Sequence, residues 1–286
     1  MWCRKGGLLT RLLCQVRCVV VLLMLVMPFA YGQGQVPAVL GVSPWTHPNL
    51  LFNWAKPVLA HIEQNSGLPV TMASAKDLKA YYEKAVAHEF DALIAPITMG
   101  YHLIQAHQFE PLMWVRVGYQ VLLVCDANGG FQSIADLQGV DVAFPMDYAS
   151  TTLVAKQALK QAGVTAVAHI LKDQWKVIET LHSGAVPCVA VLSNLYDAQA
   201  PELKARFREV YRHPLKLDAM LIAPASSGVQ VRSALMTLGQ RYSQGQSIVQ
   251  GFEVIEVEEF EFRRQALAAE LAAFKDIIRR DAQADE

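Results

Sequence analysis

The chain has 286 residues, 53% of them hydrophobic, and its formal net charge at neutral pH is −1. Loss of the four basic residues of the N-terminal leader lowers that charge to about −5, which argues against a nucleic-acid partner because nothing offsets repulsion by phosphates. The remaining chain of about 250 residues is long enough to bury one large apolar core or two smaller ones.

The first 32 residues are typical of a secretory signal peptide. An apolar stretch from Val19 to Ala30 follows four basic residues, and Ala30 and Gly32 supply the small side chains that a signal peptidase requires. We expect cleavage before Gln33 and a mature protein in the periplasm. The alternative is an uncleaved membrane anchor, but this stretch is shorter than the roughly 20 residues that a membrane-spanning helix needs.

Three of the five cysteines lie in the leader, and the other two, Cys125 and Cys188, lie in apolar runs that predict buried strands. Buried cysteines often pack as small hydrophobic side chains. We therefore expect two separate thiols rather than a disulfide, although the periplasm permits a disulfide.

The first part of the mature chain alternates short apolar runs with amphipathic stretches, which predicts parallel strands flanked by helices. The predicted strands are 39–42, 69–72 and 91–95, and the predicted helices are 49–64, 76–88 and 99–107. The third helix begins where a strand ends, which is a usual place for a pocket in such sheets.

A second series of the same kind follows two extended runs, 113–117 and 119–125, and a turn over 126–130. Its predicted strands are 140–144, 167–170 and 188–191, and its predicted helices are 150–161 and 174–182. The chain then returns with a predicted strand, 219–223, and a predicted helix, 231–242. The final helix, 258–280, has an apolar stripe that we expect to pack on the first lobe. The stripe consists of Phe260, Leu267, Leu271, Phe274 and Ile278.

Two α/β series joined by extended segments near 119–125 and 215–223 predict two lobes connected by two hinge strands. After a signal peptide over 1–32, the first lobe is expected to comprise 33–120 and 217–286, and the second lobe 121–216. Clefts between such lobes are preferred ligand sites.

Several motifs resemble one known family. The most specific segment runs from Ser133 to Thr152 and resembles the family pattern S-x-x-D-L-x-G, a strand, and D-x-x-S-T/A-S-G. Matches at 41–44, at 90–96 with Tyr101, and at 251–252 add to it. On these segments the chain resembles the phosphate, phosphite and phosphonate binding proteins of ABC importers. The resemblance implies an α/β, two-lobed type 2 periplasmic binding fold, a small anionic ligand and an inner-membrane ABC permease as partner.

The start of the predicted helix at Ser150 is the main candidate for ligand binding. A helix N-terminus carries unpaired backbone N–H groups and the positive end of the helix dipole. The hydroxyls of Ser150, Thr151 and Thr152 add donors at the same point, which suits an oxyanion. The alternative is ordinary helix capping by Ser150 or Asp147. Because no arginine lies in this stretch, neutral donors would hold the anion.

Four further residues are ligand-binding candidates. Tyr101 follows a strand end, from which its phenol can donate to the ligand, the alternative being a surface tyrosine. Ser43 and Trp45 follow the first strand, where a hydroxyl and an indole N–H can face a cleft; Trp45 is equally a candidate for packing. Gln174 stands where the family's aminophosphonate binders carry a histidine, and Pro187 stands where the family usually carries an aspartate. The resemblance thus disfavours an aminophosphonate and leaves phosphite, phosphate, an alkylphosphonate or another small anion open.

The sequence offers no convincing catalytic or metal site. The eight histidines are dispersed without metal-ligand spacing, and no nucleophile elbow or phosphate loop is present. Cys188 with His169 as base is conceivable, but no charge adjoins the thiol. We expect no catalysis, no cofactor, no metal and a monomer. The alternatives are a stand-alone sensor of the same fold for a membrane kinase or cyclase, and an enzyme built on this scaffold.

Overall fold

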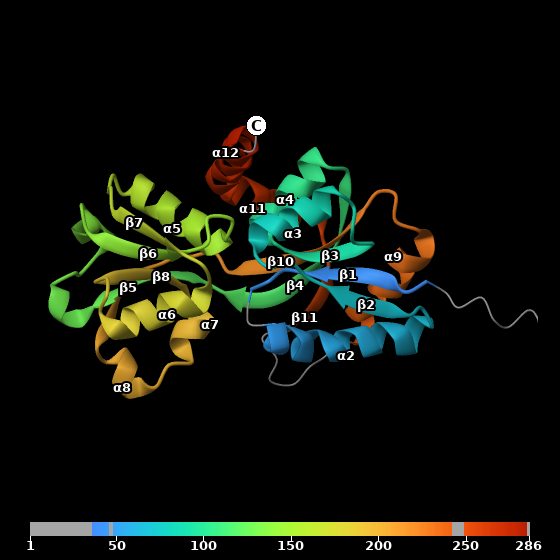
Figure 1. The fold of residues 1–286 in the computed structure, drawn as a ribbon, viewed down its shortest axis with the longest axis horizontal. Helices are drawn as coiled ribbons and strands as arrows, with labels where there is room; N and C mark the ends of the chain where they lie inside the picture. The colour runs from blue at the N-terminus through green and yellow to red at the C-terminus, as the bar shows by residue number, and fades with distance from the viewer. Residues whose placement is uncertain (1–35, 46–47, 242–248, 285–286) are drawn as a thin grey trace, which may run out of the picture. The chain divides into compact units, whose positions relative to one another are not determined.

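The computed structural model describes residues 36–45, 48–241 and 249–284 (Figure 1). The predicted signal peptide lies outside the described residues. Among the residues that are described, no helix has both the length and the apolar character needed to cross a membrane. The described strands form two separate sheets, each flanked by helices.

The first lobe contains a six-stranded sheet in the order β11-β4-β10-β3-β1-β2. Its strands are β1 (Ala38–Val42), β2 (Val70–Ala73), β3 (Ala92–Pro96), β4 (Phe109–Tyr119), β10 (Leu217–Pro224) and β11 (Gly251–Val254). Strands β1, β2 and β3 pair in parallel, whereas β10 runs antiparallel to both β3 and β4, and β11 runs antiparallel to β4. The sheet is therefore parallel on the β2 side and antiparallel on the β11 side.

Apolar residues on both faces of this sheet explain why helices cover it on two sides. The helices are α2 (Pro48–Ser66), α3 (Leu78–Val86), α4 (Ile97–Ala106), α9 (Val229–Met236) and α10 (Leu238–Arg241). Within β3, Ala92 and Ile94 belong to the core under α2 and α9, while Leu93 and Ala95 belong to the core on the opposite face. This alternation follows from the two-residue period of a strand.

The second lobe contains a five-stranded sheet in the order β7-β6-β8-β5-β9. Its strands are β5 (Val121–Asp126), β6 (Asp141–Pro145), β7 (Val167–Leu171), β8 (Cys188–Leu192) and β9 (Phe207–Arg212). Its helices are α5 (Ser150–Gln161), α6 (Gln174–Ser183), α7 (Ser193–Asp197) and α8 (Pro201–Lys204). Strand β6 is parallel to β7 and β8, and β5 is antiparallel to β8 and β9.

Two short connections join the sheets. Strand β4 ends at Tyr119 and β5 begins at Val121, so the first connection is Gln120. The second connection covers residues 213–216, between β9 and β10. The Gln120 side chain donates from Nε2 to the carbonyl oxygen of His213 at 2.9 Å, which ties the two connections together. The segments expected to be hinges, 119–125 and 215–223, lie mostly inside the sheets.

The expectation of two separate thiols was wrong, because Cys125 and Cys188 form a disulfide. The residues lie directly opposite each other in the antiparallel pair β5–β8, with Cα atoms 4.0 Å apart. The neighbouring N–H of Asp126 donates to the carbonyl of Pro187, so the cysteines occupy a non-hydrogen-bonded position. Facing side chains come closest at such positions, and this register cannot be read from the sequence.

The C-terminal segment also differs from the prediction of one helix on the first lobe. It consists of α11 (Val257–Ala266) and α12 (Ala268–Ala284), separated by the buried Leu267. Helix α12 contacts both α4 of the first lobe and α5 of the second (Figure 1). The Tyr148 hydroxyl, from the loop before α5, donates to Asp281 of α12 at 3.0 Å. Because α4 and α5 contact each other, α12 also contacts α5 when it packs on α4.

Candidate functional site

Four helices begin directly at the ends of strands or just beyond them. Helix α4 follows β3, α5 follows β6, α6 follows β7, and α7 follows β8. Pockets in α/β sheets form at the carboxyl ends of parallel strands, and two adjoining pockets lie here. They share the lining residues Trp45, Pro96, Tyr119, Gln174 and Leu192. Because these residues come from both lobes, the two pockets form one interlobe cleft.

The first pocket, called the hydroxyl pocket here, includes Ser150 and Thr151 at the start of α5. The Ser150 hydroxyl lies 2.9 Å from the hydroxyl of Thr98 in α4, across the gap between the lobes. The N-cap residue of α5 is Ala149, and no side chain caps this helix. Asp147 instead pairs with Lys156 at 3.0 Å. The capping alternative considered for Ser150 and Asp147 therefore does not describe this helix end.

Thr151 and Gln174 form a buried polar pair in the hydroxyl pocket. Gln174, at the start of α6, donates from Nε2 to Oγ1 of Thr151 at 2.8 Å. Since Thr151 Oγ1 accepts this bond, its own hydrogen is available for another acceptor. Gln174 Oε1 is buried and has no hydrogen-bond partner among the described residues. The pair thus offers a guest one donor and one acceptor.

Thr152 and Tyr101 lie away from both pockets. The Thr152 hydroxyl donates to the carbonyl oxygen of Pro145, within its own strand-to-helix turn. Tyr101 is fully buried, and its hydroxyl donates to the carbonyl oxygen of Phe260 at 2.8 Å. Burial raises the pKa of the Tyr101 phenol well above its ordinary value. The other five predicted residues line the cleft: Ser43, Trp45, Ser150, Thr151 and Gln174. Ligand binding by any of the seven stays a prediction.

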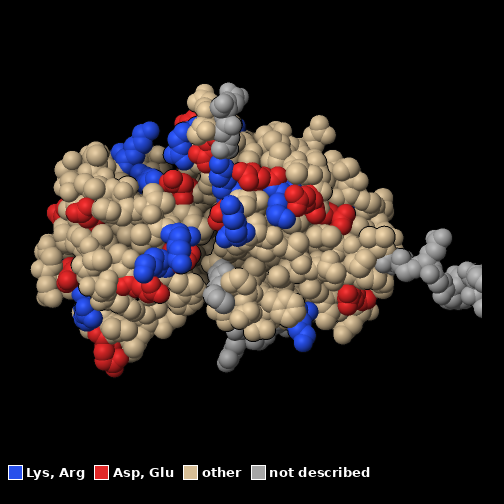
Figure 2. Space-filling model, viewed as in Figure 1, with Lys and Arg blue, Asp and Glu red and all other residues tan. Residues whose placement is uncertain are grey.

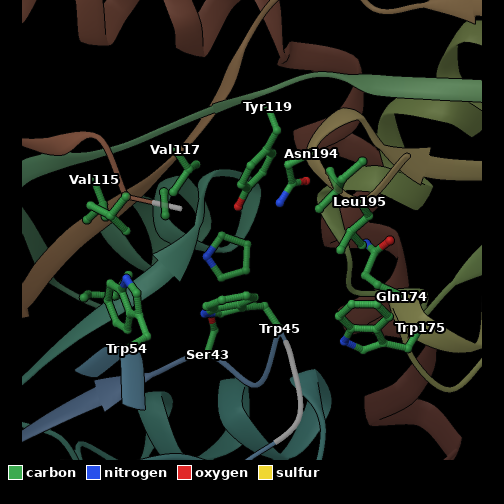
Figure 3. A pocket seen from close by; sticks show the side chains of 15 residues that line it. Ser43, Trp45, Trp54, Val115, Val117, Tyr119, Gln174, Trp175, Asn194 and Leu195 are labelled. Carbon is green, nitrogen blue, oxygen red and sulfur yellow. The ribbon is translucent and has the colours of Figure 1, made fainter. Parts of the chain in front are cut away.

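The second pocket, called the aromatic pocket here, has a wall formed by Trp45, Trp54, Tyr119 and Trp175 (Figure 3). It encloses about 700 Å³, open solvent included. In Figure 3 the Trp45 ring lies between Trp54 and Trp175, and it meets Trp54 edge to face with ring centroids 6.3 Å apart. Burial raises the pKa of the Tyr119 phenol, so this hydroxyl stays protonated and can donate.

Neutral groups dominate the cleft. Asp218 is the one charged side chain among the described residues that line the two pockets. Its carboxylate is already paired with Arg116 at 2.9 Å and Arg263 at 3.2 Å, and it accepts from the backbone N–H groups of Val117 and Gly118. Figure 2 shows both signs of charge interspersed over the visible face. An anion in the cleft would therefore meet hydroxyls, an amide and helix N-termini rather than a lysine or arginine.

Several lining residues were not identified from the sequence as site residues, namely Trp54, Tyr119, Trp175 and Asn194. Trp175 adjoins Gln174 at the start of α6, and Asn194 lies at the start of α7. For Trp175 and Asn194, the position just after a predicted strand end was the signal in the sequence that could have identified them. In the part of the chain that the structure describes, no group of three His, Cys, Asp or Glu residues is placed to hold a metal ion.

Two sheets flanked by helices, joined by two connections and enclosing a cleft, define a two-lobed periplasmic binding protein. Residues 40–262 match the sequence model of the family described as "ABC transporter, phosphonate, periplasmic substrate-binding protein". The chain belongs to this family of phosphonate ABC-transporter binding proteins. The family is one of periplasmic substrate-binding proteins rather than of enzymes. No curated protein sequence matches the chain.

Solved structures with the same fold include three informative neighbours. A binding-protein component of an ABC phosphonate transporter from Pseudomonas aeruginosa has a TM-score of 0.66 and 13% identity, covering 88% of this chain and 100% of its own. PhnD1 from Prochlorococcus marinus, in complex with methylphosphonate, has a TM-score of 0.70 and 13% identity, covering 82% and 98%. The protein XAC2383 from Xanthomonas citri, bound to ATP, has a TM-score of 0.70 and 17% identity, covering 84% and 98%. At these identities the likeness establishes the fold.

Proposed function

We propose that this chain captures a small oxyanion, phosphonate-like, phosphite-like or phosphate-like, in the interlobe cleft and delivers it to an inner-membrane ABC permease. The observation that carries the proposal is the buried Thr151–Gln174 pair beside Ser150 at the start of α5, a helix without a side-chain cap. A helix N-terminus favours negative charge, and hydroxyl donors there add hydrogen bonds to an anion. Membership of the phosphonate-binding family supports the same ligand class.

The hydrogen-bonding pattern favours a singly protonated acid group. Thr151 can donate to one ligand oxygen, while the unpartnered Gln174 Oε1 needs a donor such as a P–OH group. A fully ionised group would place a second negative charge against that carbonyl oxygen. We infer that the monoanion binds more tightly than the dianion.

Ligand capture would proceed by closure of the two lobes, with boundaries at 33–120 plus 217–286 and at 121–216. The two connections, Gln120 and 213–216, are short and adjacent, which suits a hinge. A ligand that contacts Thr151 on one lobe and Trp45 on the other would favour the closed state. The proposed mature protein starts at Gln33 after signal cleavage and works as a monomer in the periplasm.

The test is isothermal titration calorimetry of the purified mature chain with methylphosphonate, phosphite and phosphate, with sulfate as a comparison. We expect saturable binding of at least one phosphorus oxyanion and no turnover of it. The variant Thr151→Val should weaken that binding about tenfold, because one charge-assisted hydrogen bond is lost. Absence of binding by all the phosphorus oxyanions, or unchanged affinity in Thr151→Val, would overturn the proposal.

A further inference from the structure

We infer that the ligand is an organic phosphonate whose substituent is a flat apolar group, such as an aromatic ring, and that this group occupies the aromatic pocket. The inference rests on the proposed function, since it assumes that the acid group lies at Thr151 and Gln174. It specifies the chemical nature of the substituent, the part of the ligand beyond the acid group. Inorganic phosphate and phosphite have no such part, and methylphosphonate has only a methyl group.

The chemistry of the aromatic pocket is the first argument. Three tryptophans and a tyrosine form its wall, and the remaining described lining residues are mostly aliphatic, including Ile94, Val115 and Leu195. Water next to such a surface is unfavourable, and a guest that buries it gains affinity in proportion to the apolar area covered. Indole faces also favour flat rings through offset or edge-to-face contacts. A pocket built for a bare inorganic anion has no need of this wall.

The connection between the pockets is the second argument. Gln174 lines both of them, and its amide bonds to Thr151 while its neighbour Trp175 belongs to the aromatic wall. Trp45 and Tyr119 also line both pockets. A ligand whose acid group contacts Thr151 can therefore extend its substituent past Gln174 between Trp45 and Trp175. One molecule with an acidic end and an apolar end fits the two pockets together.

Unpartnered polar atoms supply the third argument. Three residues that line the aromatic pocket carry a buried side-chain atom without a partner among the described residues: Trp54 Nε1, Gln174 Oε1 and Asn194 Oδ1. Buried polar atoms are nearly always hydrogen-bonded, and exceptions call for an explanation. A bound guest can supply the missing partners, with its acid group serving Gln174 Oε1 and its substituent serving Trp54 Nε1 and Asn194 Oδ1. This arrangement also indicates that a polar substituent on the ring is tolerated.

The experiment compares phenylphosphonate with methylphosphonate by calorimetry on the mature chain at one pH. We expect phenylphosphonate to bind at least about tenfold more tightly, because its ring covers apolar area that a methyl group leaves exposed. Trp175→Ala should remove most of this advantage, because phenylphosphonate should lose much more affinity than methylphosphonate. Trp175 is 41% exposed, so the variant should fold. Phe52→Ala is the matched control, because Phe52 is an exposed aromatic residue on α2 outside both pockets.

A second variant tests the same pocket by filling it. Leu195→Trp adds volume to the wall and should weaken phenylphosphonate more than methylphosphonate. Equal affinity for the two phosphonates in the unmodified protein, or an equal loss of both in Trp175→Ala, would overturn the inference while leaving the proposed function intact. If neither phosphonate binds, nor phosphite or phosphate, then the proposed function itself fails.

Discussion

The hydroxyl oxygens of Thr98 and Ser150 lie 2.9 Å apart although the two residues belong to different lobes. Thr98 is in the first turn of α4 and Ser150 is the first residue of α5. Two helix N-termini therefore meet at the cleft through one hydrogen bond. This contact is a direct link between the lobes beside the candidate anion site.

We predict that this bond stabilises the arrangement of the lobes by about 0.5–1.5 kcal/mol. Thr98→Val and Ser150→Ala should each lower the free energy of urea unfolding by that amount, and the double variant should lose little more, because both changes remove the same bond. The comparison pair is Thr180→Val with Ser150→Ala, since the Thr180 hydroxyl donates to the carbonyl oxygen of Lys176 within its own helix. Additive losses in Thr98→Val/Ser150→Ala would show that the two hydroxyls are not coupled.

Gln174→Glu should abolish phosphonate binding, with a loss of at least about 100-fold in affinity. The substitution places a carboxylate beside Thr151 at the point where the acid group is proposed to lie, and two negative charges in a buried site repel strongly. Calorimetry of the variant measures the effect. Gln161→Glu, an equal change at the exposed end of the neighbouring helix α5, is the control and should bind normally. Retained binding in Gln174→Glu contradicts the placement of the anion.

Affinity for a phosphonate should fall as pH rises through the second ionisation of the ligand. The reason is that Gln174 Oε1 needs a donor, which the monoanion has and the dianion lacks. Calorimetric titration over a pH series would measure the slope, with an alkylsulfonate as the comparison because it has no second proton to lose. A phosphonate affinity that rises with pH would refute the proposed role of Gln174.

Stability should decrease between about pH 6.5 and about pH 4 because of His102. Burial, with smaller contributions from His107 and Lys275, lowers the pKa of His102 from 6.5 to about 4. The unfolded chain therefore takes up a proton in this range that the folded chain does not, so stability is lost as pH falls. The variant His102→Gln should show a shallower decrease in melting temperature. The exposed His88→Asn is the control, and an unchanged slope in His102→Gln would contradict the prediction.

The disulfide between Cys125 and Cys188 should contribute roughly 2–4 kcal/mol to stability, because it closes a long loop in the unfolded chain. Both cysteines are fully buried, so a reductant should act on unfolded molecules only. Urea unfolding of the oxidised protein, compared with Cys125→Ala/Cys188→Ala, measures the difference. Reductant added to the double variant should change nothing. Equal stability of the two proteins would refute the prediction.

Most helices and strands could be predicted, because the apolar periodicity of the sequence and the residues that mark the ends of helices and strands indicate the same segments. Helix α5 occupies the predicted range 150–161. Strand β9 was missed because Phe207–Arg212 contains three charged residues and resembles a surface loop, whereas its place at the sheet edge tolerates them. The break at Leu267 was missed since no Gly or Pro marks it. Packing of α12 against two lobes is a tertiary effect that a single helix's sequence does not encode.

The candidate site could be predicted in part. Ser150, Thr151 and Gln174 each follow a predicted strand end, which placed them at one edge of a sheet. The hydrogen bond between Gln174 and Thr151 depends on the neighbouring positions of β6 and β7, which only the pairing pattern reveals. Tyr101 lies one turn into α4 with its ring against Phe260 of α11, outside the two pockets, and its role at the ligand stays a prediction. The residue type alone did not show whether the Tyr101 side chain points into the cleft or toward α11.

Helix α12 is attached to both sides of the cleft, and this attachment restricts how the molecule can move. A motion that pulls α4 straight away from α5 must separate α12 either from α4 or from the α5 side, where Tyr148 contacts Asp281 and Phe274. A rotation of one lobe against the other about an axis along α12 keeps these contacts, while the edge of the cleft opposite α12 widens. We therefore expect α12 to restrict opening at its own side of the cleft, so that solute enters from the side of the molecule that faces away from it.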